Sequence, residues 1–400
     1  MKVAWQSCTF GDVVDLEQGL AFNKKNRHFM SNHGIPLLRI TNLINDTEDK
    51  FVNEKFIREK YIAKREDLIF TRTGQVGLIF RGKIGVVHNN CFRVIPRDGI
   101  SSGYVYWYLR QPNFRERVIS VASGSAQPDI THGAFKSLPF HYPPLPIQNE
   151  IDLILSKYDN LIENNTRSIA ILEKMSEVIY REWFEKFNFR GHKSTKLIDS
   201  PNGLIPKGWE IKKISEIIDF IGGSQPPKKF HIYEERTGYV RFIQNRDYGP
   251  KNNLTYIPES RRNKHCQKLD IMVDKYGQAG QTRFGLVGAY NVALAKLLPH
   301  KTHHREWLRG LISRPRFRMN LAASSMASTR PSLNKSHFVV NVPVPPDNIS
   351  QEFKQIIEPI NLQILLHKDR IANLQLVLEL LLGKLCSGKM DLGEFESVVI

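Results

Sequence analysis

The stretch from Ile147 to Arg190 reads IQNEIDLILSKYDNLIENNTRSIAILEKMSEVIYREWFEKFNFR and contains neither glycine nor proline. Its apolar residues recur at steps of three and four, a spacing that predicts a long helix with a narrow, coiled-coil-like stripe. At about 1.5 Å per residue such a helix is roughly 60 Å long. The polar Asn165 and Ser168 interrupt the stripe at its middle, where polar residues can set the register of paired helices. The stripe consists of Ile151, Ile154, Tyr158, Leu161, Leu172, Met175 and Ile179.

A second stretch with the same character runs from Ser350 to Leu385. Pro359 falls inside it, and we expect this proline to kink or split the helix. A single helix cannot bury a narrow stripe alone, so the two helices are expected to pair, most simply antiparallel. The second stripe consists of Phe353, Ile356, Ile360, Ile371, Leu374, Leu378, Leu381 and Leu385.

Each long helix follows a globular segment, and the two segments repeat one another. Trp5 to Gly19 corresponds to Trp209 to Gly223, and Asp67 to Gly77 corresponds to Asp270 to Gly280. Both segments end in a proline-rich turn before the helix begins. We therefore predict an α+β protein with a pseudo-twofold internal repeat, in which two tandem α/β domains are separated by two long antiparallel coiled-coil-like helices. The predicted boundaries are 1–146 and 191–347 for the domains, 147–190 for the first helix, and 348–400 for the second helix with its tail.

Short β-branched runs bounded by glycine and asparagine predict a β-rich body in each domain. A helix is expected over Ser102 to Gln111, and its equivalent should begin near Arg305. In the first domain the expected strands are Leu37–Thr41, Asp67–Thr71, Gly77–Phe80, Gly85–His88 and Phe92–Ile95.

The net charge of +17 is concentrated in the two globular segments. Residues 1–147 hold 20 basic and 13 acidic residues, and residues 191–347 hold 26 and 12. The helical segments 148–190 and 348–400 are each slightly acidic. This distribution indicates that the globular parts bind a polyanion and that the helices have another role.

No catalytic motif stands out. Gly77 to Ile84 approaches a phosphate-binding loop but has isoleucine where the motif needs a hydroxyl, in a strand–turn–strand context. His300, His303 and His304 lie close together, but no acidic or cysteine ligand completes a metal spacing. Neither a cofactor nor a metal is therefore expected. Four isolated cysteines, the absence of a signal-peptide core and the lack of an apolar membrane span suit a reducing cytoplasm.

Polar loops recur at equivalent places in the two domains, beside glycines that let a loop approach a surface closely. Arginine, asparagine and glutamine can form paired hydrogen bonds with base edges, so these loops are the candidate DNA contacts. The alternative is that Gln75 and Gln278 merely hold hairpin turns. The candidates in the first domain are Arg39, Thr41, Asn42, Arg72, Thr73, Gln75 and Gln127. Those in the second are Gln244, Asn245, Arg246, Lys275, Tyr276, Gln278, Thr329 and Arg330. In the expected repeat, Arg39, Thr41 and Asn42 are equivalent to Phe242, Gln244 and Asn245.

The order of these features resembles the specificity (S) subunit of type I restriction-modification enzymes. The resemblance covers nearly the whole chain, including the junction Tyr180–Phe184 and the lead-in Leu204–Trp209. It implies that each domain is a target recognition domain that reads one half of a split, asymmetric double-stranded DNA sequence. It also implies that the helices set the gap between the half-sites and that this chain has no catalytic activity. The chain would dock methylation (M) subunits, usually two, and would bind restriction (R) subunits through them. The docking residues it suggests are Arg181, Trp183, Phe184, Phe187 and Phe189.

Two other classes of function remain open from the sequence. One is a stand-alone DNA-modifying enzyme, a methyltransferase or nuclease, with an unrecognised catalytic site. The other is a basic scaffold that binds an acidic protein, for which DNA binding would be absent or insensitive to salt.

Overall fold

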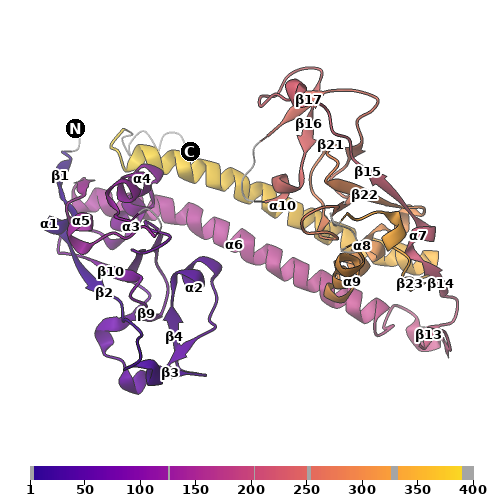
Figure 1. Ribbon diagram of the computed structural model, residues 1–400, viewed down its shortest axis with the longest axis horizontal. Helices are drawn as coiled ribbons and strands as arrows, with labels where there is room; N and C mark the ends of the chain where they lie inside the picture. Colours follow the sequence, from indigo (N-terminus) through magenta and orange to yellow (C-terminus); the bar gives the residue numbers. More distant parts are fainter. Residues whose placement is uncertain (1–3, 125–126, 202, 250–253, 326–331, 390–400) are drawn as a thin grey trace. The chain divides into compact units, whose positions relative to one another are not determined.

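The computed structural model describes residues 4–124, 127–201, 203–249, 254–325 and 332–389 (Figure 1). Two compact units divide the described residues: the first takes those of 1–164 and 371–400, and the second takes those of 165–370. Both long helices therefore contribute one part to each unit. Among the described helices, none has a stretch long and apolar enough to cross a membrane.

The first unit contains two main sheets. An antiparallel sheet has the order β2–β10–β7–β8, and a mixed sheet has the order β3–β5–β4–β9–β6, in which β4 and β9 are parallel. The first sheet is formed by β2 (Val14–Gln18), β10 (Cys91–Pro96), β7 (Leu68–Thr71) and β8 (Ile79–Phe80). The second is formed by β3 (Met30–Ser31), β5 (Phe51–Val52), β4 (Ile35–Leu38), β9 (Gly85–Val87) and β6 (Ile62–Ala63).

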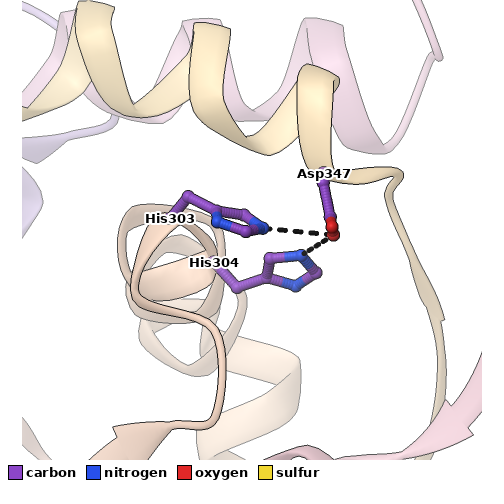
Figure 2. A group of neighbouring side chains, drawn as sticks. All are labelled: His303, His304 and Asp347. Atoms are coloured by element: carbon purple, nitrogen blue, oxygen red, sulfur yellow. Dashed lines mark hydrogen bonds and ion pairs between the residues drawn. The ribbon is translucent and has the colours of Figure 1, made fainter.

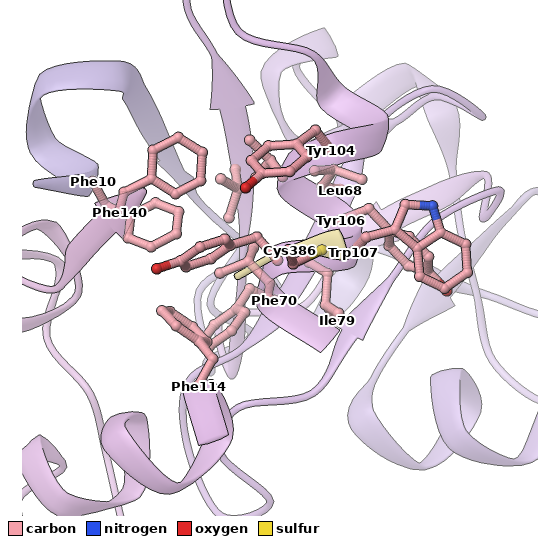
Figure 3. Packing of buried hydrophobic residues seen from close by; sticks show 14 of the residues in the cluster. Phe10, Leu68, Phe70, Ile79, Tyr104, Tyr106, Trp107, Phe114, Phe140 and Cys386 are labelled. Carbon is pink, nitrogen blue, oxygen red and sulfur yellow. The ribbon is translucent and has the colours of Figure 1, made fainter. Parts of the chain in front are cut away.

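Helices and a short strand pair complete the first unit. The strands β1 (Gln6–Thr9) and β11 (Pro139–Tyr142) are antiparallel and join the two ends of the domain. The helices are α1 (Phe10–Val13), α2 (Ile40–Asn45), α3 (Ser102–Arg110), α4 (Pro112–Val121) and α5 (His132–Lys136). Figure 3 shows the core, where aromatic residues such as Phe10, Tyr104 and Phe140 pack with Cys386 from the end of the chain. Residues near the end of the second long helix are therefore part of the first unit's core, namely Leu378, Leu381, Leu382, Leu385 and Cys386.

The second unit repeats this plan. Its antiparallel sheet has the order β15–β22–β19–β20 and its mixed sheet the order β17–β16–β21–β18, with β16 and β21 parallel. The strands are β14 (Glu210–Lys213), β15 (Ile218–Gly222), β16 (Tyr239–Ile243), β17 (Tyr256–Pro258), β18 (His265–Cys266), β19 (Ile271–Asp274), β20 (Thr282–Arg283), β21 (Gly288–Tyr290), β22 (Leu294–Pro299) and β23 (Asn341–Val344). The helices are α7 (Ile214–Ile217), α8 (Arg305–Ser313) and α9 (Pro315–Ser325), and a small hairpin of β12 (Leu197–Ile198) and β13 (Ile205–Pro206) precedes them.

The long helices α6 (Leu145–Phe184) and α10 (Asp347–Leu385) run antiparallel, as predicted. In the first unit, Leu155 near the start of α6 is buried in one cluster with Leu382 near the end of α10. In the second unit, Phe184 at the end of α6 packs on Phe353 near the start of α10, with ring centroids 4.6 Å apart. The pairing is thus established separately within each unit.

Several details of the helix predictions were wrong. The first helix ends at Phe184 and not at Arg190, and Phe187 beyond it has a positive φ of 58°. The expected split at Pro359 was wrong, because one helix runs through this proline, with Ile357 and Asn361 buried on either side of it. Three residues assigned to the apolar stripes are exposed, namely Leu161, Met175 and Ile356. Instead, residues next to the predicted stripe, such as Leu155 and Tyr180, are buried.

The predicted strand Leu37–Thr41 also needs correction, because β4 ends at Leu38 and α2 begins at Ile40. The other four expected strands and the helices at Ser102 and Arg305 are present, within two residues of the predicted bounds at each end.

Candidate nucleic-acid interface

The loop after β7 presents Gln75 at the surface of the first unit. Gly74 and Gly77 flank it with φ angles of 79° and 87°, a conformation that favours glycine and makes the turn tight. The amide of Gly74 donates to the carbonyl of Pro128, 2.9 Å away. Gln127, also exposed, precedes Pro128, so the structure places these two predicted contacts on adjacent loops.

Arg72 and Thr73 hold these two loops together. The guanidinium of Arg72 donates to both carboxylate oxygens of Asp129, at 3.0 and 2.7 Å, and to Gln18 Oε1 at 3.0 Å. The Thr73 hydroxyl donates to the same carboxylate. These hydrogen bonds, that of Arg72 first, lower the pKa of the Asp129 carboxyl. Arg72 and Thr73, which were predicted to contact DNA, thus position this loop through hydrogen bonds within the protein.

Arg39 and Asn42 form a similar internal support. Arg39 donates to Asn42 Oδ1 at 2.8 Å and to both carboxylate oxygens of Asp49 at 2.6 and 2.7 Å. Asn42 is buried, and its amide donates to Asp49 and to the carbonyl of Thr47. Thr41 between them is exposed. Among these three, Thr41 is the side chain that faces solvent.

A basic hollow lies beside Arg39. It has a volume of about 360 Å³ and is lined by Phe22, Asn23, Lys24, Arg27, Met30, Leu37, Arg39, Lys50 and His88. The imidazole of His88 lies parallel to the ring of Phe22, with centroids 6.2 Å apart. Burial, followed by the charge of Arg39, lowers the pKa of His88. Such a surface can accept phosphate oxygens, and of its residues the sequence had indicated Arg39 as a DNA contact.

The corresponding loop of the second unit carries different chemistry. Gly277 and Gly280 flank Gln278 with φ angles of 75° and 82°, so the turn has the same form. Lys275 takes the place of Arg72, and its ammonium lies 5.7 Å from the ring centroid of the exposed Tyr276. No carboxylate in the described part of the chain forms an ion pair with Lys275. This cation is therefore available to a ligand, whereas Arg72 is engaged.

The sheet register corrects one part of the predicted repeat. In the parallel strand pairs, Leu37 lies opposite Val86 and Phe242 opposite Ala289, so Arg39 corresponds to Gln244 and Asn42 to Asp247. Arg39 and Gln244 both precede the first turn of a short helix. The predicted match of Arg39, Thr41 and Asn42 with Phe242, Gln244 and Asn245 was wrong. The segment before this strand is one residue longer in the second unit, from Ser224 to Phe242 against Leu20 to Leu37, and no residue pattern marks the shift.

In this segment of the second unit, Arg246 is exposed while Gln244 and Asn245 are half-buried. Asp247 is buried in the place of Asn42, and burial raises its pKa. Thr329 and Arg330, the remaining two predicted contacts, lie outside the described residues.

The residues suggested for docking lie at the end of α6. The rings of Phe187 and Phe189 pack on Trp209, with centroids 5.2 and 5.8 Å apart, and Trp183 packs on Phe353 at 5.6 Å. Phe184 and Phe189 are buried within the second unit, Trp183 and Phe187 are half-buried, and Arg181 is half-exposed. The buried rings close the core around Trp209 and leave little surface for a partner.

A cluster of which the sequence had indicated only the histidines joins the start of α10 to the second domain. Figure 2 shows His303 and His304 pointing at Asp347, with Nε2–Oδ1 distances of 3.1 and 3.2 Å. Asp347 supplies the acidic group that the sequence appeared to lack, because the fold brings α10 next to the histidine segment. The three could hold a metal ion. However, the Lys301 ammonium lies 2.8 Å from each carboxylate oxygen and already neutralises the charge that a cation would need.

The fold thus defines a protein with two homologous basic domains, each presenting its own polar loop and each joined to a long helix. A sequence profile described as the type I restriction modification DNA specificity domain matches twice, at residues 2–174 and 206–376. The chain therefore belongs to this family.

Individual relatives agree with this assignment. The MjaIX specificity subunit of a type I restriction enzyme from Methanocaldococcus jannaschii is 25% identical over 82% of this chain and 78% of its own length. The MjaVIII specificity subunit of the same organism is 28% identical over 52% of this chain and 48% of its own length. The crystal structure of a type I restriction-modification S subunit from M. genitalium covers 96% of both chains with a TM-score of 0.64 and 16% identity, and so shares the fold.

Proposed function

We propose that this chain is the DNA specificity subunit of a type I restriction-modification system and that each domain reads one half of a bipartite, asymmetric target. The single observation that carries this proposal is the repeated loop. The same glycine-flanked turn presents a glutamine in both units, Gln75 and Gln278, but the two residues before the turn differ. Arg72 and Thr73 are bound to Asp129 in the first unit, whereas Lys275 and Tyr276 stand at their places in the second. Different side chains on equivalent loops imply that the two half-sites differ in base sequence.

The proposal assigns two kinds of role to the predicted residues. Direct contacts come from the exposed side chains Thr41, Gln75, Gln127, Arg246, Tyr276 and Gln278 and from the half-buried Lys275, with Thr329 and Arg330 added from the sequence. Arg39, Asn42, Arg72 and Thr73 position the loops through their hydrogen bonds within the first unit, and Gln244 and Asn245 flank Arg246 in the second. Lysine and arginine at the basic hollow contact phosphates and carry no sequence information.

The chain itself is proposed to be non-catalytic and to act in the cytoplasm with methylation subunits, two of them, and through them with restriction subunits. We place the docking surface on the outer faces of the long helices rather than on the rings around Trp209. In the first unit Leu153, Leu376 and Leu380 are more than half exposed, and in the second Ile171 and Met175 are exposed as well. Exposed apolar side chains along a helix favour contact with another protein.

A titration against random double-stranded DNA at two salt concentrations tests the binding function. Because phosphate contacts release counterions, raising salt from 50 to 200 mM should weaken binding by roughly tenfold or more. Binding that is absent or insensitive to salt would instead support a protein scaffold. Methyl transfer or cleavage by the chain alone, with S-adenosylmethionine and Mg²⁺, would contradict the non-catalytic assignment.

A further inference from the structure

The turn that presents Gln278 rests on a buried carboxylate that the first unit lacks. Asp274, at the end of β19, is 1% exposed, and the strand ladders of the two antiparallel sheets match it with Thr71. The Thr71 hydroxyl donates to the carbonyl of Gln75 at 2.5 Å and accepts from the amide of Leu78 at 2.9 Å, so it closes the first unit's turn from within. A carboxylate cannot donate to a carbonyl, so Asp274 does not close its own turn in this way.

The partner of Asp274 is Arg283 on β20. Nη2 of Arg283 donates to Asp274 Oδ2 at 3.0 Å and to Gln278 Oε1 at 3.4 Å. The ladders match Arg283 with Phe80, which packs on a small apolar cluster of the first unit. The first unit thus has a threonine and a phenylalanine where the second has an ion pair.

Stability alone does not account for this ion pair. Taking a carboxylate out of water is costly, and apolar residues in place of a buried ion pair are often at least as stabilising. Within the described residues, Asp274 Oδ1 is buried and has no hydrogen-bond partner, so its desolvation is only partly offset. What the pair provides is a guanidinium held in one place beside the turn.

This guanidinium reaches the surface. The side chain of Arg283 is 23% exposed, whereas that of Asp274 is 2% exposed. Nε of Arg283 is buried without a partner. Nη1 also has no hydrogen-bond partner in the described part of the chain, but it is not among the buried atoms. Nη1 is therefore available to a ligand that meets this surface.

Arg283 also determines which end of the Gln278 amide is left for a ligand. A cation attracts the oxygen of an amide and repels its amino group, and Gln278 Oε1 is the atom that accepts from Nη2. The exposed side chain of Gln278 therefore presents its amino group, which carries two donors. Gln75 has no such cation at the equivalent place, because Phe80 stands there. The two glutamines are thus prepared for different bases.

We propose that Arg283 and Gln278 together read a guanine in one half of the DNA target, with Asp274 as a positioning residue that acts through Arg283. This inference rests on the proposed function and adds a specificity-determining residue to it. Guanine presents two adjacent acceptors, O6 and N7, in the major groove, and these match one donor from each side chain. Adenine, the usual partner of glutamine, needs the amide oxygen that Arg283 engages.

Selection from a random double-stranded DNA library by the full chain tests the base. Gln278→Ala identifies the base pair concerned, which should be G·C. Replacing its guanine by 7-deazaguanine, which keeps base pairing but lacks the N7 acceptor, should weaken wild-type binding about tenfold. An A·T pair at this place, or a Gln278→Ala variant with unchanged preferences, would overturn the inference. Selection of no sequence at all would overturn the proposed function as well.

Variants of the ion pair test the role of Arg283. The double variant Asp274→Thr with Arg283→Phe removes both charges and copies the first unit. It should bind guanine and 7-deazaguanine targets equally and should accept A·T at the pair that Gln278→Ala identifies. Arg283→Lys keeps the charge beside Asp274 but loses the planar fork, so it should weaken the same preference, and it serves if the double variant does not fold.

Arg262→Ala is the matched control, because Arg262 is an exposed arginine of the same unit. It should leave every base preference unchanged. A folded double variant, or Arg283→Lys, that retains the full preference for guanine within an intact two-part target would overturn the inference and leave the proposed function standing.

Discussion

His367 on α10 lies with its Nδ1 2.6 Å from Asn165 Oδ1 on α6, at the polar interruption of the first helical stripe. The two residues are 202 positions apart and half-buried. Adjacent leucine and isoleucine side chains can slide along one another, but a hydrogen bond between two polar residues fixes one register. The interruption thus has a specific partner on the opposite helix.

This relationship predicts a coupling between the two side chains. Asn165→Ala or His367→Ala alone should lower the free energy of unfolding by about 0.5–1.5 kcal/mol, because each removes the hydrogen bond between the two helices. The double variant should cost less than the sum of the two. Denaturant unfolding of all four proteins measures the coupling, and strict additivity would mean that the contact does not hold the helices.

The repeated loops predict effects confined to one half of the target. Gln278→Ala should weaken discrimination at one base pair of one half-site by about 1–3 kcal/mol, and Gln75→Ala should do the same in the other half. Competition binding with singly substituted DNA targets measures both. Lys24→Ala is a suitable control, because the proposed phosphate contact of an exposed lysine at the basic hollow raises affinity uniformly, so its loss changes no base preference. A change in both half-sites from either glutamine variant would argue against independent readers.

The antiparallel helices predict a change in spacing. One heptad inserted before Asn165 in α6, with a second inserted after Arg370 in α10, keeps their register and lengthens the pair by about 10 Å. At about 3.4 Å per base pair the preferred gap between half-sites should grow by roughly three base pairs. Selection from a library of DNA targets with variable gaps measures the preferred gap directly. An unchanged gap would mean that the helices do not set the distance.

The burial of His88 predicts a dependence of stability on pH. Its pKa is lowered in the folded state by burial and then by Arg39, and its Nδ1 accepts from the amide of Asn90 at 3.3 Å. The neutral ring is favoured, so its contribution is present above the ordinary value of 6.5 and is lost as pH falls through the lower folded pKa. The Tm advantage of the wild type over His88→Asn should therefore shrink, by about 1–3 °C, on going from pH 7.5 to 5.5.

His33→Asn provides the control for this measurement, because His33 is exposed in the same unit. The same pH-dependent loss in that variant would assign the effect to the unit as a whole. A constant difference between wild type and His88→Asn would contradict the role of His88.

The sequence predicted the repeat, the paired helices and the glycine-flanked loops, because each of these can be recognised from the spacing of residue types along a single sequence. It could not predict which polar side chains face outward. Asn42 and Arg72 have the residue types of base readers, yet Asp49 and Asp129 engage them from positions that only the fold brings close. Asp347 was missed for the same reason, since it lies 43 residues after His304. The correspondence of Arg39 with Gln244 could be recognised only from the register of the parallel strands.

The central claim is that one chain directs modification to two unlike half-sites. Sequencing the methylome of a host that expresses this chain with its methylation subunits tests it most directly, alongside a variant carrying Lys275→Ala and Gln278→Ala. The account predicts a bipartite, non-palindromic methylated motif whose one half is relaxed in the variant while the other half and the gap are unchanged. A palindromic motif, or a loss of definition in both halves, would contradict it.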